Sequence, residues 1–454
     1  MIIADLHIHS KYSRGCSTQI DIDALEKYAG LKGVNLLGTG DFTHPRWIEE
    51  LKSKLSQKDD TGIYLTKSGF PFICQTEISL IYSQGGRGRK AHVVVLAPNF
   101  DAVEQITEEL KKKGRVDYDG RPIFGMSCIE FTEKMMNIDK DIEIIPAHIW
   151  TPWFSMFGAN SGFDSVKECF GDQLKYIHSI ETGMSSDPPM NWRLSQLDNM
   201  NIVSFSDMHS FWPWRMGREA TLFGKENAKN NNAEELKEEL DGLTYDKLID
   251  SIRTGKNLLG TVEVDPGYGK YHFTGHRNCD VCLSPPESLK IKDMCPKCGR
   301  LLTVGVAERV EKLADRPLGY KPKDAKQFYT LIPLSDIIAG VEGKAVATKT
   351  VWAAYNQLIK NFGNEFNILL NAPKEDLMKC CSEKLADIII KNRAGEIKVN
   401  PGYDGVYGVP EVDGIKIKSE DSGETEKAEK EKNEDKPGKA IKPWKKTQKS
   451  ITDF

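Results

Sequence analysis

Long apolar runs are missing from this chain of 454 residues. No stretch approaches the roughly 18 apolar residues that a membrane-spanning helix requires, and the segment from Met1 to Asp5 lacks the basic and apolar parts of a secretory signal. An excess of charge of one sign is missing too, because the formal net charge is −4. That balance gives no indication of nucleic-acid binding. We therefore expect a cytoplasmic protein with no membrane partner.

Cysteine is present, but not in the pattern of a disulfide framework. Of the ten cysteines, Cys279 and Cys282 form one CxxC pair, Cys295 and Cys298 form a second, and most others are scattered. Reduced thiols and one metal site explain this distribution better than disulfides do. Two CxxC pairs separated by 12 residues are typical of a closed tetrahedral zinc site with a structural role. The sequence thus predicts a four-cysteine zinc module over residues 270–300.

The rest of the chain divides into segments of different composition. In residues 1–225, short β-like runs alternate with helical patterns, which predicts an α/β barrel or a distorted relative of one. We interpret residues 226–269 as a connecting segment and residues 301–415 as a mainly helical domain. Residues 416–446 are rich in charge and poor in apolar side chains. Because they cannot bury enough surface to offset the entropy of ordering, we predict a disordered linker there.

Histidines and carboxylates gather near the ends of the predicted strands. His7 and His9 follow the first strand, and a spacing of two places both imidazoles on the same face. Asp207 and His209 repeat this arrangement after a later strand. The other candidate ligands near strand ends are Asp41, Glu77, His92 and His148. Because strand ends converge on one face of an α/β barrel, we expect a shared metal centre. Histidine and carboxylate without cysteine suit Zn, Mn or Fe, with Mg possible at oxygen-rich positions.

These motifs resemble those of the polymerase-and-histidinol-phosphatase (PHP) superfamily. The residues that carry the resemblance are 5–10 (DLHIHS), 39–41 (TGD), Glu77, His92, His148 and 206–210 (SDMHS). The resemblance implies a distorted TIM-like barrel over residues 1–225, with two or three divalent metals and phosphoesterase activity. Two departures from the superfamily pattern, Phe42 after Asp41 and the lack of a histidine near Arg14, leave open whether a third metal binds.

Longer phrases resemble the endonuclease Q family within that superfamily. They are residues 146–154 (PAHIWTPWF), 181–193 and 275–279 (GHRNC). The resemblance implies a DNA-repair endonuclease. It would nick double-stranded DNA on the 5′ side of deaminated bases, such as hypoxanthine, uracil and xanthine, and at abasic sites. Asp207, His209 and Glu77 are the catalytic residues that we predict for this reaction.

Aromatic and basic side chains near these motifs are candidates for DNA contact. The predicted DNA- or base-binding residues are Trp150, Trp153, Phe154, Trp212, Arg87 and Arg89. Flat rings can sandwich an extruded base, and guanidinium groups bind phosphates. Ordinary packing of the rings and a flexible hairpin turn over residues 85–90 are the alternatives. We also expect the helical domain, residues 301–415, to bind DNA, since residues 373–394 loosely resemble a helix-hairpin-helix.

The last eight residues, 447–454, resemble a peptide that binds sliding clamps (PCNA) of the archaeal and eukaryotic type. Gln448, Ile451 and Phe454 fall at i, i+3 and i+6, so one short helical turn would place the two apolar side chains in one groove. The linker before the peptide would then hold the enzyme near clamp-bound DNA. The resemblance implies PCNA as a partner and an archaeal source.

Two other functions compete with a repair endonuclease. A small-molecule phosphatase of the histidinol phosphatase type would account for the barrel, but it leaves the zinc module, the helical domain and the terminal peptide without a role. A noncatalytic DNA- or clamp-binding module would not need the nearly full set of metal ligands. Nicking of duplexes with a defined lesion, compared with hydrolysis of a phosphate monoester, separates the first two possibilities.

Overall fold

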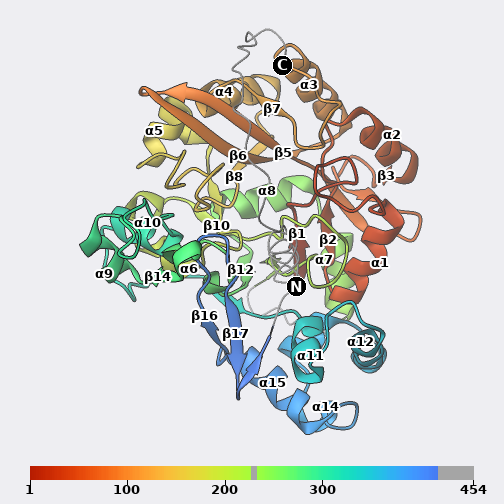
Figure 1. The fold of residues 1–454 in the computed structure, drawn as a ribbon. Coiled ribbons are helices and arrows are strands. Elements are labelled where there is room, and N and C mark those ends of the chain that lie inside the picture. The colour runs from red at the N-terminus through yellow and green to blue at the C-terminus, as the bar shows by residue number, and fades with distance from the viewer. Residues whose placement is uncertain (226–232, 418–454) are drawn as a thin grey trace, which may run out of the picture.

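The computed structural model describes residues 1–225 and 233–417, and its centre is a sheet of 11 strands (Figure 1). In chain order these strands are β1 (Ile2–Asp5), β2 (Leu36–Gly38), β3 (Ser56–Gln57), β4 (Tyr64–Leu65), β5 (Pro71–Gln84), β6 (Arg87–Ala97), β7 (Ile123–Phe124), β8 (Glu143–Pro146), β11 (Ala220–Phe223), β12 (Leu258–Glu263) and β15 (Gln327–Thr330). A separate parallel pair consists of β9 (Ser179–Glu181) and β10 (Asn201–Val203).

Neighbouring strands close into a distorted barrel. β1 pairs in parallel with β2, and β2 with β5, whereas β5, β6 and β8 pair antiparallel in that order. The backbone N–H of Ile149, after β8, donates to the carbonyl of Glu181 in β9, which in turn pairs with β10. Ile8, after β1, pairs with Met208, after β10, and this bridge completes the ring. The predicted α/β class with a distorted barrel is confirmed.

Helices surround the barrel and bury their apolar faces against it (Figure 1). They are α1 (Ile22–Lys32), α2 (Pro45–Lys54), α3 (Phe100–Lys111), α4 (Cys128–Ile138), α5 (Val166–Phe170), α6 (Pro188–Trp192), α7 (Ala233–Asp241) and α8 (Tyr245–Thr254), with the 3-10 helices η1 (Gly171–Tyr176), η2 (Ser195–Leu197) and η3 (Pro266–Tyr268). α1 illustrates how local sequence sets the two ends of a helix. The Asp21 side chain accepts the N–H of Ala24 at its start, and Gly33, with φ at +93°, ends it in a left-handed conformation.

The sheet continues beyond residue 225, where the sequence predicts a connecting segment. β12 pairs antiparallel with β11 and in parallel with β15, so two strands from the later part of the chain widen the sheet. α8 packs against the same body, because the hydroxyl of Tyr245 donates to the carbonyls of Leu96 and Asp141. The segment 226–269 is therefore part of the barrel body in its described residues, and the predicted boundary at 225 is too early.

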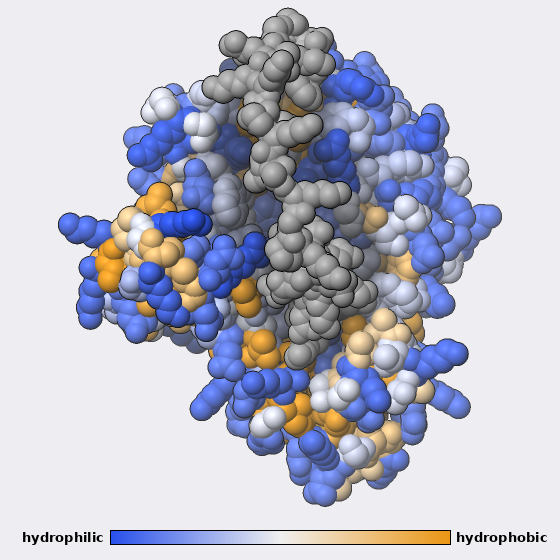
Figure 2. Space-filling model, in the orientation of Figure 1, coloured by the Kyte–Doolittle hydropathy of each residue, from blue (hydrophilic) through white to orange (hydrophobic). Residues whose placement is uncertain are grey.

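Two smaller units follow. The predicted zinc module contains β13 (Thr274–His276), η4 (Arg277–Cys279), β14 (Val281–Leu283), α9 (Pro285–Ser288) and η5 (Leu289–Ile291), and α10 (Val306–Leu313) packs beside it. The helical unit contains α11 (Leu334–Glu342), α12 (Lys349–Phe362), α13 (Glu365–Leu370), α14 (Lys374–Leu377) and α15 (Glu383–Arg393), and a small sheet follows with β16 (Lys398–Asn400), β17 (Val409–Val412) and β18 (Ile415–Lys416). On the face in Figure 2, hydrophilic residues predominate, and hydrophobic residues gather over these two units.

The fold extends two residues into the segment that the sequence predicts as a linker. Lys416 ends β18, and Ile417 is buried. The rest of the predicted linker and the clamp-binding peptide, with Gln448, Ile451 and Phe454, lie outside the described residues. Among the described residues, no helix is long and apolar enough to cross a bilayer.

A buried ion pair and an aromatic stack hold the helical unit against the barrel. Lys32 of α1 places its Nζ 2.7 Å from Oε1 of Glu365 in α13, and both side chains are almost fully buried. Trp212 and Trp214 stack with their ring centroids 5.2 Å apart, and both rings contact Trp352 of α12. Buried contacts of this kind dock the helical unit onto the barrel in one fixed orientation.

Candidate metal centre

The structure brings together histidines and carboxylates that are far apart in the sequence. Their ligand atoms form two groups, and within each group all ligand atoms lie within 4.8 Å of one another. The first group is His7, His9, Glu77 and Asp207, and the second is Glu77, His92 and His148. Four of these residues follow β1, β8 or β10, whereas Glu77 and His92 lie within the long strands β5 and β6. Both groups therefore share one side chain, Glu77.

Glu77 lies between the two groups and offers one oxygen to each. Its Oε2 lies 3.2 Å from Nε2 of His9 and 3.6 Å from Nε2 of His7. Its Oε1 lies 2.7 Å from Nδ1 of His92 and 3.1 Å from Nε2 of His148. A carboxylate that faces two ligand sets in this way can bridge two metal ions.

Several residues of the centre hold an uncommon backbone conformation. The φ angles of Asp41, His148 and Asp207 are +42°, +30° and +46°. Positive φ disfavours residues with a Cβ, and such strain persists only where the surrounding structure fixes it, often at functional sites. The fold thus holds a strained backbone that points His148 and Asp207 into the centre and places Asp41 against His9.

Two carboxylates behind the centre orient the first two histidines. Asp41 lies outside both groups: its Oδ1 lies 2.9 Å from Nδ1 of His9, and its Oδ2 accepts the backbone N–H and the hydroxyl of Ser10. Glu181 holds Nδ1 of His7 at 2.9 and 3.0 Å. A carboxylate on Nδ1 leaves Nε2 as the free ligand atom. The geometry therefore gives Asp41 an orienting role in place of the predicted metal contact, and it adds Glu181, for which the sequence predicts no role.

His209 lies beside the first group without joining it. Its Nδ1 lies 2.9 Å from the backbone oxygen of Asp207, and its ring centroid lies 4.8 Å from that of His9. The side chains of His209 and Asp207 are 36% and 29% exposed, in contrast to the fully buried His7, His9 and Glu77. Substrate can therefore reach the centre from the side of Asp207 and His209.

The charge state of the centre calls for bound cations. Burial lowers the pKa of His7, but the surrounding carboxylates, Glu181 foremost, outweigh burial and raise this pKa well above its usual value. Burial raises the pKa of Glu77, but the positive groups around it, His92 foremost, lower it well below the usual value. The Nε2 atom of His7 is also buried without a hydrogen-bond partner among the described residues. Divalent cations would replace the protons on these imidazoles, so the donor set fits such ions.

Arg121 reaches the same centre from a loop, and no sequence motif marks it. Its Nη1 donates to Oε2 of Glu77 at 2.9 Å, and its side chain is 23% exposed. The preceding Gly120 permits this approach, because a Cβ at that position would lie 2.3 Å from Oδ2 of Asp41. The remaining guanidinium donors can bind an anion next to the metal ligands.

The structure separates the predicted DNA-binding residues into buried and accessible ones. Trp150 is fully buried and donates its indole N–H to Asn191, so it belongs to the core. Arg89 is buried too, and its guanidinium pairs with Glu168. Trp212 is half-buried and packs in the aromatic stack under the helical unit. Trp150 and Arg89 are occupied in packing, which corrects the prediction for these two residues.

Trp153, Phe154 and Arg87 remain accessible. Trp153 is 40% exposed, and its ring meets the edge of Tyr271 at 5.4 Å between centroids. The ring of half-buried Phe154 lies 4.9 Å from that of His92, directly beside the second ligand group. Arg87 is exposed where β6 begins, after a two-residue turn at Gly85 and Gly86 with φ of +62° and +73°. The hairpin alternative is therefore correct for the backbone of this segment.

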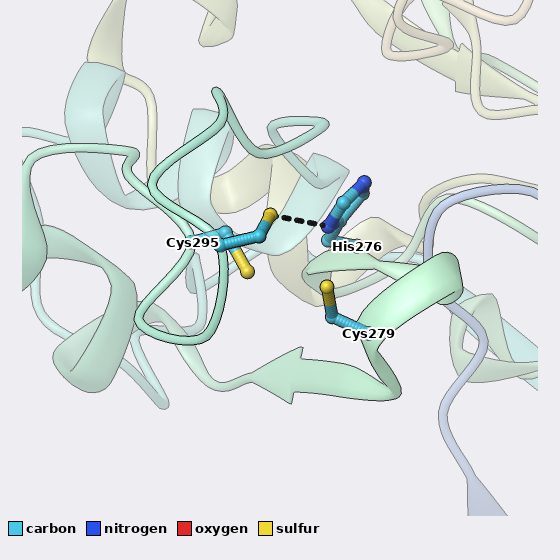
Figure 3. A group of neighbouring side chains, drawn as sticks. His276, Cys279 and Cys295 are labelled. Atoms are coloured by element: carbon cyan, nitrogen blue, oxygen red, sulfur yellow. Dashed lines mark hydrogen bonds between the residues drawn. The ribbon is translucent and has the colours of Figure 1, made fainter.

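The predicted zinc ligands come together except at one position. Cys279, Cys295 and Cys298 form a group whose ligand atoms lie within 4.8 Å of one another, and the fourth member is His276 (Figure 3). Cys282 is exposed and lies outside this group. The structure thus groups His276, and not Cys282, with the other three predicted zinc ligands.

Comparisons with known proteins agree with this architecture. The lesion-specific endonuclease PfuEndoQ from Pyrococcus furiosus has a similar structure, with a TM-score of 0.78 and 30% identity over 90% of this chain and 95% of that one. This chain belongs to the endonuclease Q family. A structure of endonuclease Q in complex with a 27-mer duplex that carries an abasic lesion at the active site is also similar, with a TM-score of 0.74 and 31% identity. The match again covers 90% of this chain and 95% of that one. The family resemblance of the sequence motifs is confirmed.

Sequence relatives of this endonuclease Q family member extend the comparison. Residues 333–396, which span α11 to α15, match the family described as the MJ0043 C-terminal domain. Protein MJ0043 of Methanocaldococcus jannaschii is 32% identical over 261 residues, a match that covers 57% of this chain but 31% of that protein. Protein YqxK of Bacillus subtilis is 27% identical over 426 residues, which cover 90% of this chain and 98% of that protein. The chain thus spans a minor part of MJ0043 and nearly all of YqxK.

Proposed function

We propose that this chain is a metal-dependent phosphodiesterase that cuts duplex DNA at lesions. The observation that carries the proposal is the position of Glu77, which faces two ligand groups with its two oxygens. The family supports duplex DNA with a lesion as the substrate. One solved structure of the family is a lesion-specific endonuclease, and another is endonuclease Q bound to a duplex with an abasic lesion. Within that class we propose cutting on the 5′ side of abasic sites and of hypoxanthine, uracil and xanthine.

Two bound divalent ions would supply the electrophilic and nucleophile-activating chemistry of such a hydrolysis. We assign the binding of these ions to His7, His9, Glu77, His92, His148 and Asp207. Asp41 and Glu181 hold two of the imidazoles in the tautomer that presents Nε2. Arg121 is placed to neutralise a phosphate oxygen next to Glu77. His209, exposed beside Asp207, can exchange a proton with the reacting groups.

The DNA contacts of the proposal rest on the accessible residues. Phe154 lies beside His92, and the exposed Trp153 precedes it in the chain, so the two rings can stack on a nucleotide that leaves the duplex at the lesion. The exposed Arg87 at the hairpin tip can contact backbone phosphates. We also propose that the helical unit binds the duplex and that residues 447–454 bind PCNA. If a deletion of Ile451–Phe454 left the affinity for PCNA unchanged, the proposed PCNA binding would be refuted.

Asp207→Ala tests the proposal. The variant loses a ligand of the more accessible group, so we expect nicking of an abasic duplex to fall by at least about 10³-fold while duplex binding is retained. The exposed Asp172, outside both groups, provides the matched control Asp172→Ala, which should nick normally. End-labelled duplexes with an abasic site, uracil, hypoxanthine or xanthine, next to an undamaged duplex and a phosphate monoester, give the readout. Full nicking by folded, metal-loaded Asp207→Ala would refute the assignment, and hydrolysis of the monoester alone would favour the phosphatase alternative.

A further inference from the structure

The loop after β1 borders the accessible side of the metal centre. We define this entrance loop as residues 12–17. A Cβ on Gly15 would lie 3.8 Å from Cδ2 of His209, and the backbone N–H of Ser17 donates to the carbonyl of His209 at 2.9 Å. Substrate can reach the centre from the side of His209, so the entrance loop lies beside the path of the substrate.

Arg14 is the basic residue of the entrance loop, and its side chain is 75% exposed. Its Nε lies 3.3 Å from Oδ2 of Asp119. Its guanidinium carbon lies 5.8 Å from the ring centroid of Tyr118, whose hydroxyl accepts the backbone N–H of Ile123. No described residue accepts a hydrogen bond from the two Nη groups of Arg14. These groups are therefore free to bind an anion in the paired geometry that suits phosphate.

A buried carboxylate fixes the position of Arg14. Asp119 is 5% exposed, and its Oδ1 accepts the backbone N–H of Arg14 at 3.3 Å and that of Arg121 at 3.2 Å. The backbone N–H of Gly120 donates to the carbonyl of Tyr12 at 3.0 Å. Movement of the carboxylate would leave two backbone donors without their acceptor, which costs free energy. Asp119 thus joins the entrance loop to the loop that carries Arg121.

The connection between the two loops does not need the side chain of Arg14. The backbone N–H groups of Arg14 and Gly120 already make it, and an exposed ion pair adds little to stability. The two arginines differ in depth. Arg121 donates to Glu77 and is 23% exposed, whereas Arg14 is 75% exposed at the entrance. One carboxylate therefore holds an inner and an outer guanidinium group in a fixed relation.

We propose that Arg14 binds the backbone phosphate next to the scissile phosphate, and that Asp119 is a positioning residue for this contact. A DNA strand carries a row of phosphates, so a scissile phosphate beside Arg121 brings its neighbour to the entrance loop. Asp119 fixes Arg14 relative to Arg121, and the two arginines bind successive phosphates. The inference rests on the proposed function, because that function places the scissile phosphate beside Arg121.

Nicking kinetics of the metal-loaded full chain on an abasic duplex test the contact. Arg14→Ala should raise KM by about 10- to 100-fold, the effect of losing one hydrogen bond between charged groups. It should leave kcat unchanged, because the neighbouring phosphate is bound equally in the ground state and the transition state.

The salt dependence tests whether the partner is a phosphate. In Arg14→Ala, the plot of log(kcat/KM) against the logarithm of the salt concentration should become shallower by about 0.9, as expected for one lost phosphate contact. Arg14→Lys keeps the charge and should restore the slope. The matched control is Arg115→Ala. Arg115 is 74% exposed, and Asp117 accepts two of its hydrogen bonds, so KM and the slope should stay as in the wild type.

Uncharged methylphosphonates identify the phosphate that Arg14 contacts. Each test duplex carries one such group, at the phosphate on the 5′ side or on the 3′ side of the scissile one. At the contacted position, the substitution should raise KM for the wild type and cause no further rise in Arg14→Ala. Asp119→Asn keeps an oxygen for the two backbone N–H groups but removes the charge that faces Arg14. Its rise in KM should therefore disappear in the Arg14→Ala background.

Three results would overturn the inference: an unchanged KM in Arg14→Ala, losses that add to Arg14→Ala at both methylphosphonate positions, or an equal rise in KM in Arg115→Ala. A failure of the proposed function looks different, because the wild type would then not nick the duplex at all. In that case the affinity for the duplex, measured by fluorescence anisotropy, would still show by the same fold-change and salt slope whether Arg14 binds a phosphate.

Discussion

Asp41→Asn should weaken metal binding although Asp41 lies outside both ligand groups. Oδ2 of Asp41 accepts three hydrogen bonds, from the N–H and hydroxyl of Ser10 at 2.6 and 2.7 Å and from the hydroxyl of Ser13 at 2.9 Å. In Asp41→Asn the side chain has only one oxygen, and these three donors continue to bind it. The amide nitrogen then faces Nδ1 of His9, where Oδ1 lies 2.9 Å away in the wild type. Because the amide nitrogen carries hydrogens, His9 must turn Nδ1 into an acceptor, and its proton moves to Nε2.

The magnitude follows from this change of tautomer. A proton on Nε2 removes the lone pair that points at Glu77 and Asp207, so a metal ion must first reverse the tautomer. Loss of an orienting partner costs about 10–100-fold in metal affinity, or about 1.4–2.8 kcal/mol. We expect a decrease of this size in competition with a chromophoric chelator, and an equal rise in the metal concentration needed for nicking. Asp172→Asn serves as the control on an exposed aspartate.

A double-mutant cycle separates this role from direct coordination. If Asp41 acts through His9, then adding Asp41→Asn to His9→Ala should cause no further loss, because the side chain to be oriented is gone. Losses that add in the double variant would show that Asp41 contacts the metal, as the sequence predicts. Unchanged affinity in Asp41→Asn alone would refute the tautomer argument.

Two further predictions concern stability. Lys32→Met leaves Glu365 buried without its positively charged partner, so the free energy of unfolding in urea should fall by about 3–5 kcal/mol, and adding Glu365→Gln should recover part of the loss. Burial raises the pKa of Glu263 from 4.5 to about 8. The folded chain therefore keeps a proton that the unfolded chain releases, and stability falls as pH rises through this window. Glu263→Gln should reduce that fall, seen as a higher melting temperature than the wild type at about pH 9 and little difference at about pH 5; equal pH slopes would contradict it.

The sequence predicts the candidate ligands at the strand ends because backbone geometry alone places them. A spacing of two puts His7 and His9 on one face of a strand, and parallel strands present their ends on one side of the sheet. Neither step depends on which side chains pack against which. All the residues of both ligand groups are among those predicted from the sequence. Glu77 and His92, however, lie within the antiparallel strands β5 and β6, so the family motifs and not the strand ends mark them.

Residues that act through a partner cannot be found in this way. Glu181 orients His7 across 174 positions of the chain, and Arg121 reaches Glu77 from a loop. Both contacts depend on how close the loops and strands pack, which no local pattern records. The same limit explains Trp150, which follows the ligand His148 closely but turns into the core to bond Asn191. Proximity in sequence to a ligand shows that a residue lies near the centre, but not whether it faces the substrate.

The predicted zinc module shows where a spacing motif and strand phase give different answers. CxxC spacing predicts that Cys279 and Cys282 point to the same ion, which holds only when the two residues flank a turn. Here Cys282 has already entered β14, and in a strand the side chains alternate. The period-two rule that unites His7 and His9 therefore separates Cys282 from Val281 and from the core beside it. The turn that brings two candidate ligands together begins earlier, at His276, so the hairpin and not the count of cysteines determines which candidate ligand atoms lie close together.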